Sequence, residues 1–209
     1  MRLILASTSP RRHDILALLG VSFDVVAPTF DEEISSHLSI AEDVLDIALG
    51  KARSVAAHQP NSIVIGSDTM ISLEEQKFGK PADRADAARI LRALSGKTHQ
   101  IYTSVAIIDG YGGPGLTIVE RVLVRMHPYT ELEIQGYLAC NESWDKAGAY
   151  SIQGEGRHLI AAIHGDYLAA VGLPLKPVAD YLMSRGISVP LNVDQLYGDK
   201  AFLNWSTFD

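Results

Sequence analysis

The sequence predicts an α/β or α+β domain. Helical and strand-like patterns alternate from the first residues, and neither an internal repeat nor a low-complexity tract interrupts them. The chain has 209 residues, of which 47% are hydrophobic and 21% are charged. It can therefore bury a large core, and it carries too little charge to be disordered. No linker divides the chain, and one ordinary domain accounts for its length.

The first part of the chain predicts a strand, a helix and a second strand. Ser9 stands at the expected N-cap of the helix, Pro10 at its first position, and Gly20 at its C-terminal end. The expected elements are a strand at Leu3–Ala6, a helix at Arg11–Leu19, a strand at Phe23–Ala27 and an acidic, exposed loop at Pro28–Ser36.

A long helix is expected next. Ser39 and Glu42 form a capping box that opens a helix over about Ile40–His58. Lys51 falls on the apolar stripe of this helix, four residues before Val55. A lysine that points inward needs a partner.

The rest of the chain predicts a buried strand, an antiparallel hairpin and four further helical or strand-like segments. The hairpin has two long β-like runs joined by a glycine-rich turn. The elements are a strand at Ser62–Gly66, a helix at Asp83–Leu94, hairpin strands at His99–Asp109 and Leu116–Met126, a helix from Thr130 to Leu138, a strand at Leu159–Ile163 and a helix at Lys176–Arg185.

The overall charge is acidic, since 18 Lys and Arg stand against 25 Asp and Glu for a net charge of −7. Nonspecific nucleic-acid binding relies on many basic side chains, so nucleic acid is not an expected partner. No apolar run reaches the roughly 18 to 20 residues of a membrane span, and none near the start has the length of a secretory signal. The single cysteine, Cys140, cannot form an internal disulfide, and the expected compartment is the cytoplasm.

The turn from Ser7 to Arg12 is a candidate anion site. A helix N-terminus attracts anions through its free N–H groups and its dipole, and here hydroxyl groups and two adjacent arginines, Arg11 and Arg12, are added. This combination suits phosphate. The alternative is that Ser9 only caps the helix while both arginines point to solvent.

Asp68 is a candidate catalytic or metal-binding residue. It is expected directly after the strand Ser62–Gly66, and ligands of open α/β sheets collect at the carboxyl ends of strands. A carboxylate at such an end can hold a metal or accept a proton. An ordinary turn formed by Asp68 and Thr69 is the alternative.

Lys51 and Lys80 are candidates for binding polyphosphate, because lysines act as point charges for phosphate groups. Lys51 could instead extend to the edge of its helix, and Lys80 could be solvated surface. Residues 142–154 form a polar, glycine-containing stretch that suits a loop around a ligand, with Gln153 able to read a base edge. The same composition fits a plain loop.

Together these segments resemble the Maf family. Nine motifs occur in the family's order and at family-like separations over about Met1 to Arg185. They are Ser7-Thr8-Ser9-Pro10-Arg11-Arg12, Asp31-Glu32, Lys51-Ala52, Ser67-Asp68-Thr69, Gly79-Lys80-Pro81, Ser95-Gly96-Lys97-Thr98-His99, Asp145-Lys146-Ala147-Gly148-Ala149-Tyr150, Ile152-Gln153-Gly154 and Val171-Gly172-Leu173-Pro174-Leu175.

The resemblance implies a nucleoside triphosphate pyrophosphatase, which cleaves between the α- and β-phosphates and releases a monophosphate and pyrophosphate. It implies an elongated, two-lobed fold of the ITPase kind, with a mixed, twisted sheet flanked by helices and a central cleft. A divalent cation, Mg²⁺ or Mn²⁺, and a homodimer are implied as well. The Maf-like domain would span residues 1–186. Residues 187–209, which show no strong periodicity, would be a C-terminal extension.

The resemblance also assigns roles to residues. Asp68 matches the family's catalytic carboxylate, and we expect Asp68 and Glu32 to bind the metal; whether Asp68 is a base or only a metal ligand stays open. Arg11, Thr69 and Gln153 match positions linked to substrate choice. The expected substrate-binding residues are Ser7, Arg11, Arg12, Lys51, Thr69, Lys80 and Gln153.

The motifs around Gln153 resemble the subgroup that acts on dTTP and UTP, with CTP and modified pyrimidine nucleotides as further candidate substrates. Ser151 and the pair Ser143-Trp144 differ from the family's usual residues, and these differences bear on base preference. One alternative is a pyrophosphatase for 7-methyl-GTP or altered purine nucleotides. Another is a nucleotide-binding regulator of cell division in which hydrolysis is incidental.

Overall fold

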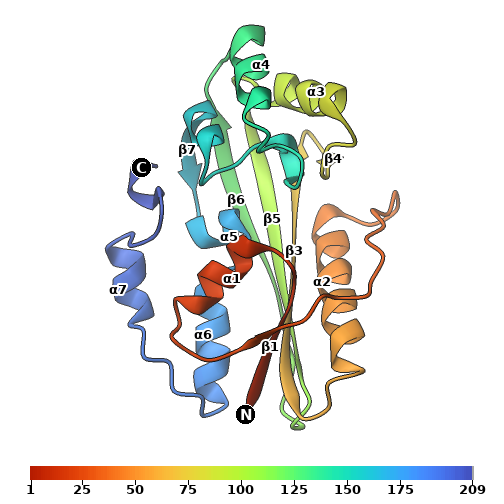
Figure 1. The fold of residues 1–209 in the computed structure, drawn as a ribbon, viewed down its shortest axis with the longest axis vertical. Helices are drawn as coiled ribbons and strands as arrows, with labels where there is room; N and C mark the ends of the chain where they lie inside the picture. Colours follow the sequence, from red (N-terminus) through yellow and green to blue (C-terminus); the bar gives the residue numbers. More distant parts are fainter. Residues whose placement is uncertain (209) are drawn as a thin grey trace.

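A twisted seven-stranded sheet runs the length of the molecule in the computed structural model, which describes residues 1–208 (Figure 1). The strand order is β2-β1-β3-β5-β6-β7, and β4 pairs with the far end of β3. Strands β2, β1 and β3 are parallel and all other pairs are antiparallel, which confirms the predicted mixed sheet. The strands are β1 (Arg2–Ala6), β2 (Asp24–Val25), β3 (Ser62–Leu73), β4 (Gln76–Phe78), β5 (Thr98–Asp109), β6 (Leu116–Met126) and β7 (Ile160–His164).

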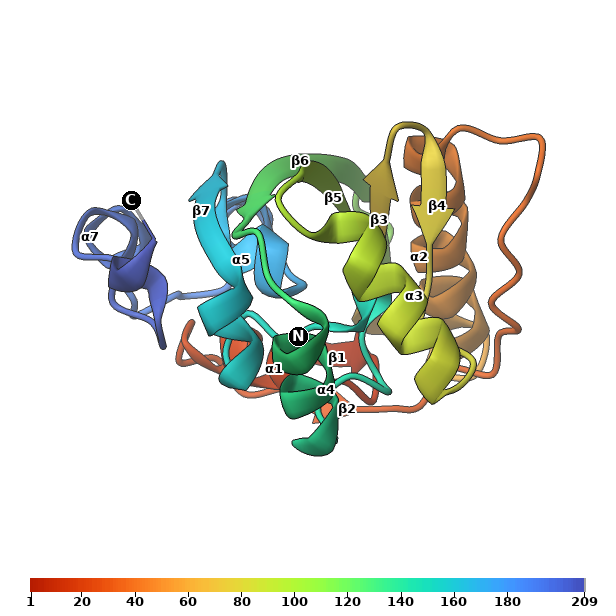
Figure 2. The ribbon, with the colours of Figure 1, turned by 90° about the horizontal axis from the view of Figure 1, so that it is seen from above.

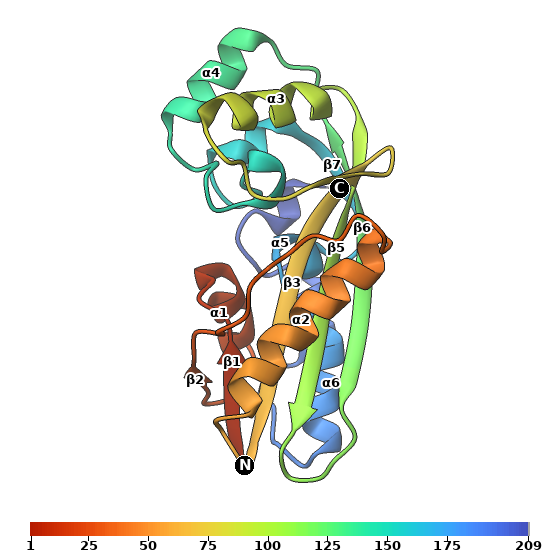
Figure 3. The ribbon, with the colours of Figure 1, turned by 90° about the vertical axis from the view of Figure 1, so that its right-hand side faces the viewer.

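Helices cover both faces of the sheet. Helix α2 lies alone on one face, whereas α1, α5 and α6 lie on the other, and α3 and α4 form the far end of the elongated molecule (Figures 2 and 3). Within residues 1–208, no helix has both the length and the apolar composition needed to cross a membrane. The helices are α1 (Pro10–Ala17), α2 (Ile40–Ala56), α3 (Arg84–Leu94), α4 (Glu131–Ala139), α5 (Tyr167–Val171), α6 (Leu175–Ser184) and α7 (Val193–Gly198).

The alternation of side chains along the strands explains the two layers of core. Successive residues of a strand point to opposite faces, so Ile4 and Val64 pack against Ala48 and Ala52 of α2. Their neighbours in sequence, such as Leu5, belong to the larger cluster that includes α1 and α6. The capping box predicted for α2 is present, and α4 also begins with a capping box, formed by Thr130 and Glu133. The predicted hairpin is β5–β6.

The prediction that Asp68 follows a strand is wrong, because β3 continues through this residue to Leu73. The parallel pairing with β1 ends at Gly66, and the pairing with β4 begins only at Ile71. Residues 67–70 of β3 are therefore paired with β5 on one side and open on the other. The carboxylate therefore lies two residues beyond the point where β1 ends, and not at the end of its own strand.

Other differences come from short or apolar segments. The second strand is limited to Asp24–Val25, because only these two residues pair with β1. Helix α5 is apolar at every position and therefore has no periodic pattern to detect; Asp166 caps it. The segment after Ile187 contains α7 and a 3₁₀ turn at Trp205–Thr207, although no periodic pattern marked either one.

Candidate active site

A cleft of about 480 Å³ opens beside residues 67–70 of β3. Its walls come from the N-terminus of α1, from α2, from α5 and from the loop of residues 145–153. All the residues predicted for the site line it. They are Ser7, Arg11, Arg12, Glu32, Lys51, Asp68, Thr69, Lys80 and Gln153.

The N-terminus of α1 forms one wall. Ser9 holds the N-cap position as predicted, but its side chain makes no capping hydrogen bond. Instead, the backbone N–H of Ser9 donates to Ser7 Oγ over 3.2 Å. The end of the helix is thus left without a side-chain cap and faces the cleft, where its dipole favours an anion.

Arg12 is fixed in the cleft and does not point to solvent. Its Nε donates to the carbonyl oxygen of Gly172 over 2.9 Å, and its Nη2 donates to Thr69 Oγ1 over 3.2 Å. Burial lowers the pKa of the Arg12 guanidinium from its ordinary value, while the nearby Asp68 carboxylate raises it. The guanidinium is still a cation at neutral pH, and its orientation is set before any ligand binds.

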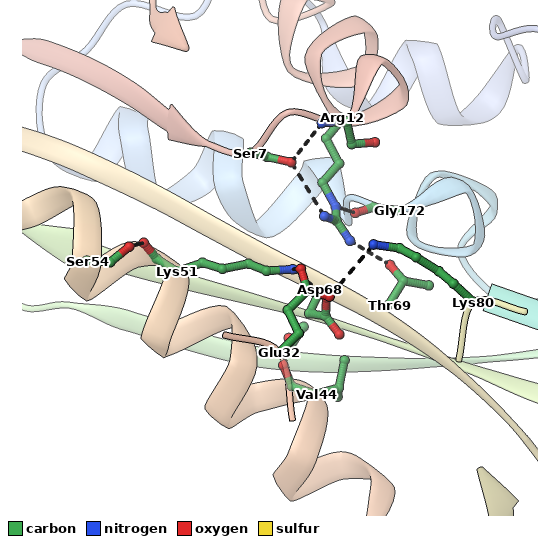
Figure 4. Close-up of polar contacts among 12 residues, drawn as sticks. Ser7, Arg12, Glu32, Val44, Lys51, Ser54, Asp68, Thr69, Lys80 and Gly172 are labelled. Carbon is green, nitrogen blue, oxygen red and sulfur yellow. Dashed lines mark hydrogen bonds and ion pairs between the residues drawn. The ribbon is translucent and has the colours of Figure 1, made fainter. Parts of the chain in front are cut away.

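Lys51 lies between two carboxylates (Figure 4). Its Nζ is 2.7 Å from Asp68 Oδ1 and 2.7 Å from Glu32 Oε1, while Lys80 Nζ is 3.8 Å from Glu32 Oε2. Lys51 is only 4% exposed and Asp68 only 6%, so the alternative that Lys51 extends to the helix edge is wrong. The inward lysine has the partners that its position required.

Close packing of α2 on β3 makes this contact possible. A Cβ added to Gly66 would lie 2.4 Å from the carbonyl oxygen of Ala48, so only glycine lets the helix approach the strand this closely. Two residues further along β3, Asp68 points to the same face of the sheet and meets Lys51 one helical turn after Ala48. The separation of helix and strand therefore sets the separation of amine and carboxylate.

The charge of the cleft is opposite to that of the whole chain. Five cationic side chains and three anionic ones line it, an excess of two positive charges on a protein of net charge −7. Burial acts to raise the pKa of Glu32, but the hydrogen bond from Lys51 and the charges of Lys51, Lys80 and Arg12 together lower it below its ordinary value. Glu32 is therefore ionised at neutral pH, and the cleft is suited to a polyanion.

The carboxylates also fit a divalent cation that a ligand helps to hold. No group of three or more His, Cys, Asp or Glu that could hold a metal occurs in residues 1–208. Glu32 and Asp68 nevertheless lie on either side of Lys51 Nζ, each with one oxygen on that amine, and Oδ2 of Asp68 accepts no hydrogen bond from the described part of the chain. Mg²⁺ is commonly bound by one or two carboxylates together with substrate phosphates and water, and these two residues supply that part of such a site.

Much of the lining of the cleft is apolar, which composition alone did not predict. Gln153 is half-buried there, and no hydrogen bond from residues 1–208 engages its side chain. Asp145 Oδ2 accepts from Arg11 Nη1 over 3.2 Å and joins this loop to α1. The apolar side chains that line the cleft include Ile34, Ile47, Met70, Ile71, Ile101, Tyr150, Ile152 and Val171. A flat ring with polar edges would fit against such a lining.

Tyr150 is held by a buried histidine that sequence reasoning treated only as a strand residue. The Tyr150 hydroxyl and His99 Nε2 lie 2.8 Å apart, and His99 Nδ1 has no hydrogen-bond partner within residues 1–208. His99 is 1% exposed, and burial lowers the pKa of its imidazole to about 4 from an ordinary value of 6.5. His99 is therefore neutral in the native protein at neutral pH.

His99 should make the protein less stable in mild acid. As the pH falls below 6.5 the unfolded chain takes up a proton at this histidine, whereas the native protein does so only near pH 4. The free energy of unfolding should therefore fall by about 3 kcal/mol across this window. Urea denaturation at several pH values measures the free energy of unfolding. This free energy should depend less steeply on pH in His99→Gln than in the wild type. His158→Gln, at an exposed histidine, should keep the wild-type pH dependence of the unfolding free energy. If His99→Gln also kept it, His99 would not be the cause of the acid sensitivity.

The chain is similar in sequence to proteins that carry one name. A "dTTP/UTP pyrophosphatase" of Moorella thermoacetica is 44% identical over 188 residues, which cover 90% of this chain and 97% of the relative. A protein of the same name from Bacillus anthracis is 42% identical with the same coverage. Among solved structures, a HAM1 protein from Coxiella burnetii aligns with 88% of this chain and 99% of its own at 12% identity and a TM-score of 0.48, which is too distant to support an argument. The family model "Maf-like protein" matches residues 2–185, and the chain therefore belongs to the Maf family.

Proposed function

We propose that this protein is a nucleoside triphosphate pyrophosphatase that hydrolyses dTTP and UTP to the monophosphate and pyrophosphate. The observation that carries the proposal is a positively charged cleft in which Asp68 lies beside Lys51, Arg12 and the open end of α1. The names of the relatives, "dTTP/UTP pyrophosphatase", support the choice of reaction and of base.

Asp68 acts as the general base in the proposed mechanism. Its Oδ2 takes a proton from a water molecule, and the water oxygen forms a bond to the α-phosphorus. The bond from the α-phosphorus to the bridging oxygen breaks, and that oxygen keeps the electron pair and leaves with the pyrophosphate. The reaction needs an aligned water and charge neutralisation, so no nucleophilic side chain is required.

The basic residues stabilise the charge that develops on the phosphates. Arg11, Arg12, Lys80 and the N-terminus of α1 bind the phosphate chain, and Lys51 keeps Glu32 ionised and holds both carboxylates in place. Glu32 and Asp68 would hold Mg²⁺ or Mn²⁺, which supplies Lewis-acid stabilisation of the phosphate oxygens when it is bound. The cleft volume, about 480 Å³, falls in the range of small-molecule sites.

Gln153 and its neighbours would recognise the base. A carboxamide can accept from the N3–H of uracil or thymine and donate to an adjacent carbonyl oxygen, and the Gln153 side chain is free to do so. Thr69 and Arg11 line the same cleft and are proposed to contribute to substrate choice. The apolar wall formed by Tyr150 and Ile152 would contact the faces of the ring.

A panel of nucleotides tests the proposal. With Mg²⁺ and dTTP, UTP, CTP, 7-methyl-GTP, ITP or ATP, we expect pyrophosphate from dTTP and UTP above all others. Release only from a purine nucleotide would keep the reaction but overturn the assignment of Gln153. A nucleotide bound stably with Mg²⁺ and never hydrolysed would favour the regulator over the enzyme.

The family resemblance also leads us to propose a homodimer. From the acidic net charge we propose that there is no nucleic-acid partner, and from the single cysteine that the compartment is the cytoplasm. Sedimentation at twice the mass of the chain would support the dimer.

A further inference from the structure

The C-terminal segment 187–208 packs against the wall of the cleft. Figures 1 and 2 place α7 beside α5 and β7, on the far side of the sheet from α2. The family match ends at residue 185, so this segment adds contacts that the matched region lacks.

Aromatic residues fix the segment to α5. Trp205 is buried and stacks on Tyr167, the first residue of α5, with ring centroids 5.3 Å apart and planes 15° apart. The ring of Tyr197 meets Trp205 edge-on, with centroids 5.0 Å apart. The Tyr167 hydroxyl donates to the carbonyl oxygen of Leu203 over 2.6 Å. The chain on both sides of residue 204 is thus held in place.

Helix α5 is in turn part of the substrate cleft. The Tyr197 hydroxyl donates over 2.9 Å to Asp166, whose other carboxylate oxygen caps α5. Val171 lines the cleft, and the following residue, Gly172, accepts the hydrogen bond from Arg12. The C-terminal segment therefore rests on the same element that orients the phosphate-binding arginine.

Asn204 extends from this anchored segment to the base-recognition loop. Its backbone is in the left-handed region, with φ of 63°, a conformation that asparagine tolerates better than most residues. Its Nδ2 donates to the carbonyl oxygen of Gln153 over 2.9 Å. This bond fixes the peptide that carries the Gln153 side chain into the cleft.

We propose that Asn204 is a positioning residue for base recognition, which fixes Gln153 from outside the cleft. The proposal rests on the proposed function, in which Gln153 contacts the pyrimidine. Local bonds restrain the loop on the other side of Gln153, since the Gly154 N–H donates to Ser151 Oγ and the Glu155 N–H donates to Glu142. Within residues 1–208, Asn204 supplies the side-chain contact to the Gln153 carbonyl itself.

Asn204→Gly tests the proposal, because glycine keeps the left-handed backbone while it removes the amide donor. We expect KM for dTTP and UTP to rise about 3- to 10-fold and kcat at saturation to be retained. The preference for dTTP and UTP over CTP should become smaller. Amides of residues 151–156 should exchange hydrogen faster. Ser206→Ala, at an exposed position of the same turn, should change none of these quantities.

A double-mutant cycle with Gln153→Ala separates positioning from general stabilisation. If Asn204 acts through Gln153, Asn204→Gly should add nothing to KM in the Gln153→Ala background. If Gln153→Ala raises KM but Asn204→Gly changes neither KM nor hydrogen exchange, the proposed role of Asn204 is wrong and the proposed function stands. If Gln153→Ala leaves KM and base preference unchanged, the assignment of Gln153 in the proposed function fails, and the role of Asn204 fails with it.

Discussion

Asp68→Asn is expected to reduce kcat by about 10²- to 10⁴-fold, the range for removal of a general base. Asparagine has the same shape and can still accept a hydrogen bond from Lys51, but it cannot take the proton from water. The cleft should keep its geometry, so KM should change little. Steady-state pyrophosphate release from dTTP measures the effect, and thermal unfolding checks that the variant is folded.

Metal titration of the same variant distinguishes the two roles left open for Asp68. If Asp68 is mainly a metal ligand, Asp68→Asn should weaken Mg²⁺ binding, and high Mg²⁺ should restore turnover; if it is the base, no Mg²⁺ concentration should restore it. Asp14→Asn, at an exposed carboxylate on α1, is the matched control and should behave as wild type. Wild-type turnover by Asp68→Asn would rule out both roles.

Lys51→Met should have the second largest effect. It removes a cation that lies 2.7 Å from each of two carboxylates, and losing one such electrostatic stabiliser lowers turnover by about 10²- to 10³-fold. The Lys51 ammonium helps to lower the pKa of Glu32, so that pKa should rise in the variant. Glu32 would then become protonated at a higher pH, and the acid limb of the pH–rate profile should move to higher pH.

Lys51→Arg, which keeps the charge, should restore part of the activity and the wild-type acid limb. Lys97→Met, at an exposed lysine paired with Glu74, should leave both unchanged. A Lys51→Met protein with wild-type turnover and an unshifted profile would show that the buried amine serves only the packing of α2.

Local signals predicted most of the fold. The capping box at Ser39 and the hydrophobic stripe of α2 are encoded within a few residues of one another, so the helix and the inward direction of Lys51 could be read from the sequence. The β5–β6 hairpin was predictable for the same reason. Helix α5 was not, because a short helix that is apolar at every position has no periodicity.

Long-range pairing explains the errors in the site. The length of β3 depends on its pairing with β5. Residues 67–70 of β3 pair with β5 residues that lie more than thirty positions later in the chain. The polar residues Ser67 and Asp68 interrupt the apolar run, which is why the sequence predicts that the strand ends before them. The turn at Ser7–Arg12 could be predicted as a candidate site, and it does line the cleft, because its hydroxyls, arginines and helix end are adjacent in sequence. By contrast, the hydrogen bond from Asn204 to Gln153 joins residues 51 positions apart, and no local sequence pattern predicts it.

The most direct test of the proposed reaction is to hydrolyse dTTP in water labelled with heavy oxygen and to find which product carries the label. Attack at the α-phosphorus by water that Asp68 deprotonates predicts label in the nucleoside monophosphate and none in pyrophosphate. Mass spectrometry of both products reads the result. Label in pyrophosphate, or in released orthophosphate, would mean that water attacks a different phosphorus and would contradict the mechanism.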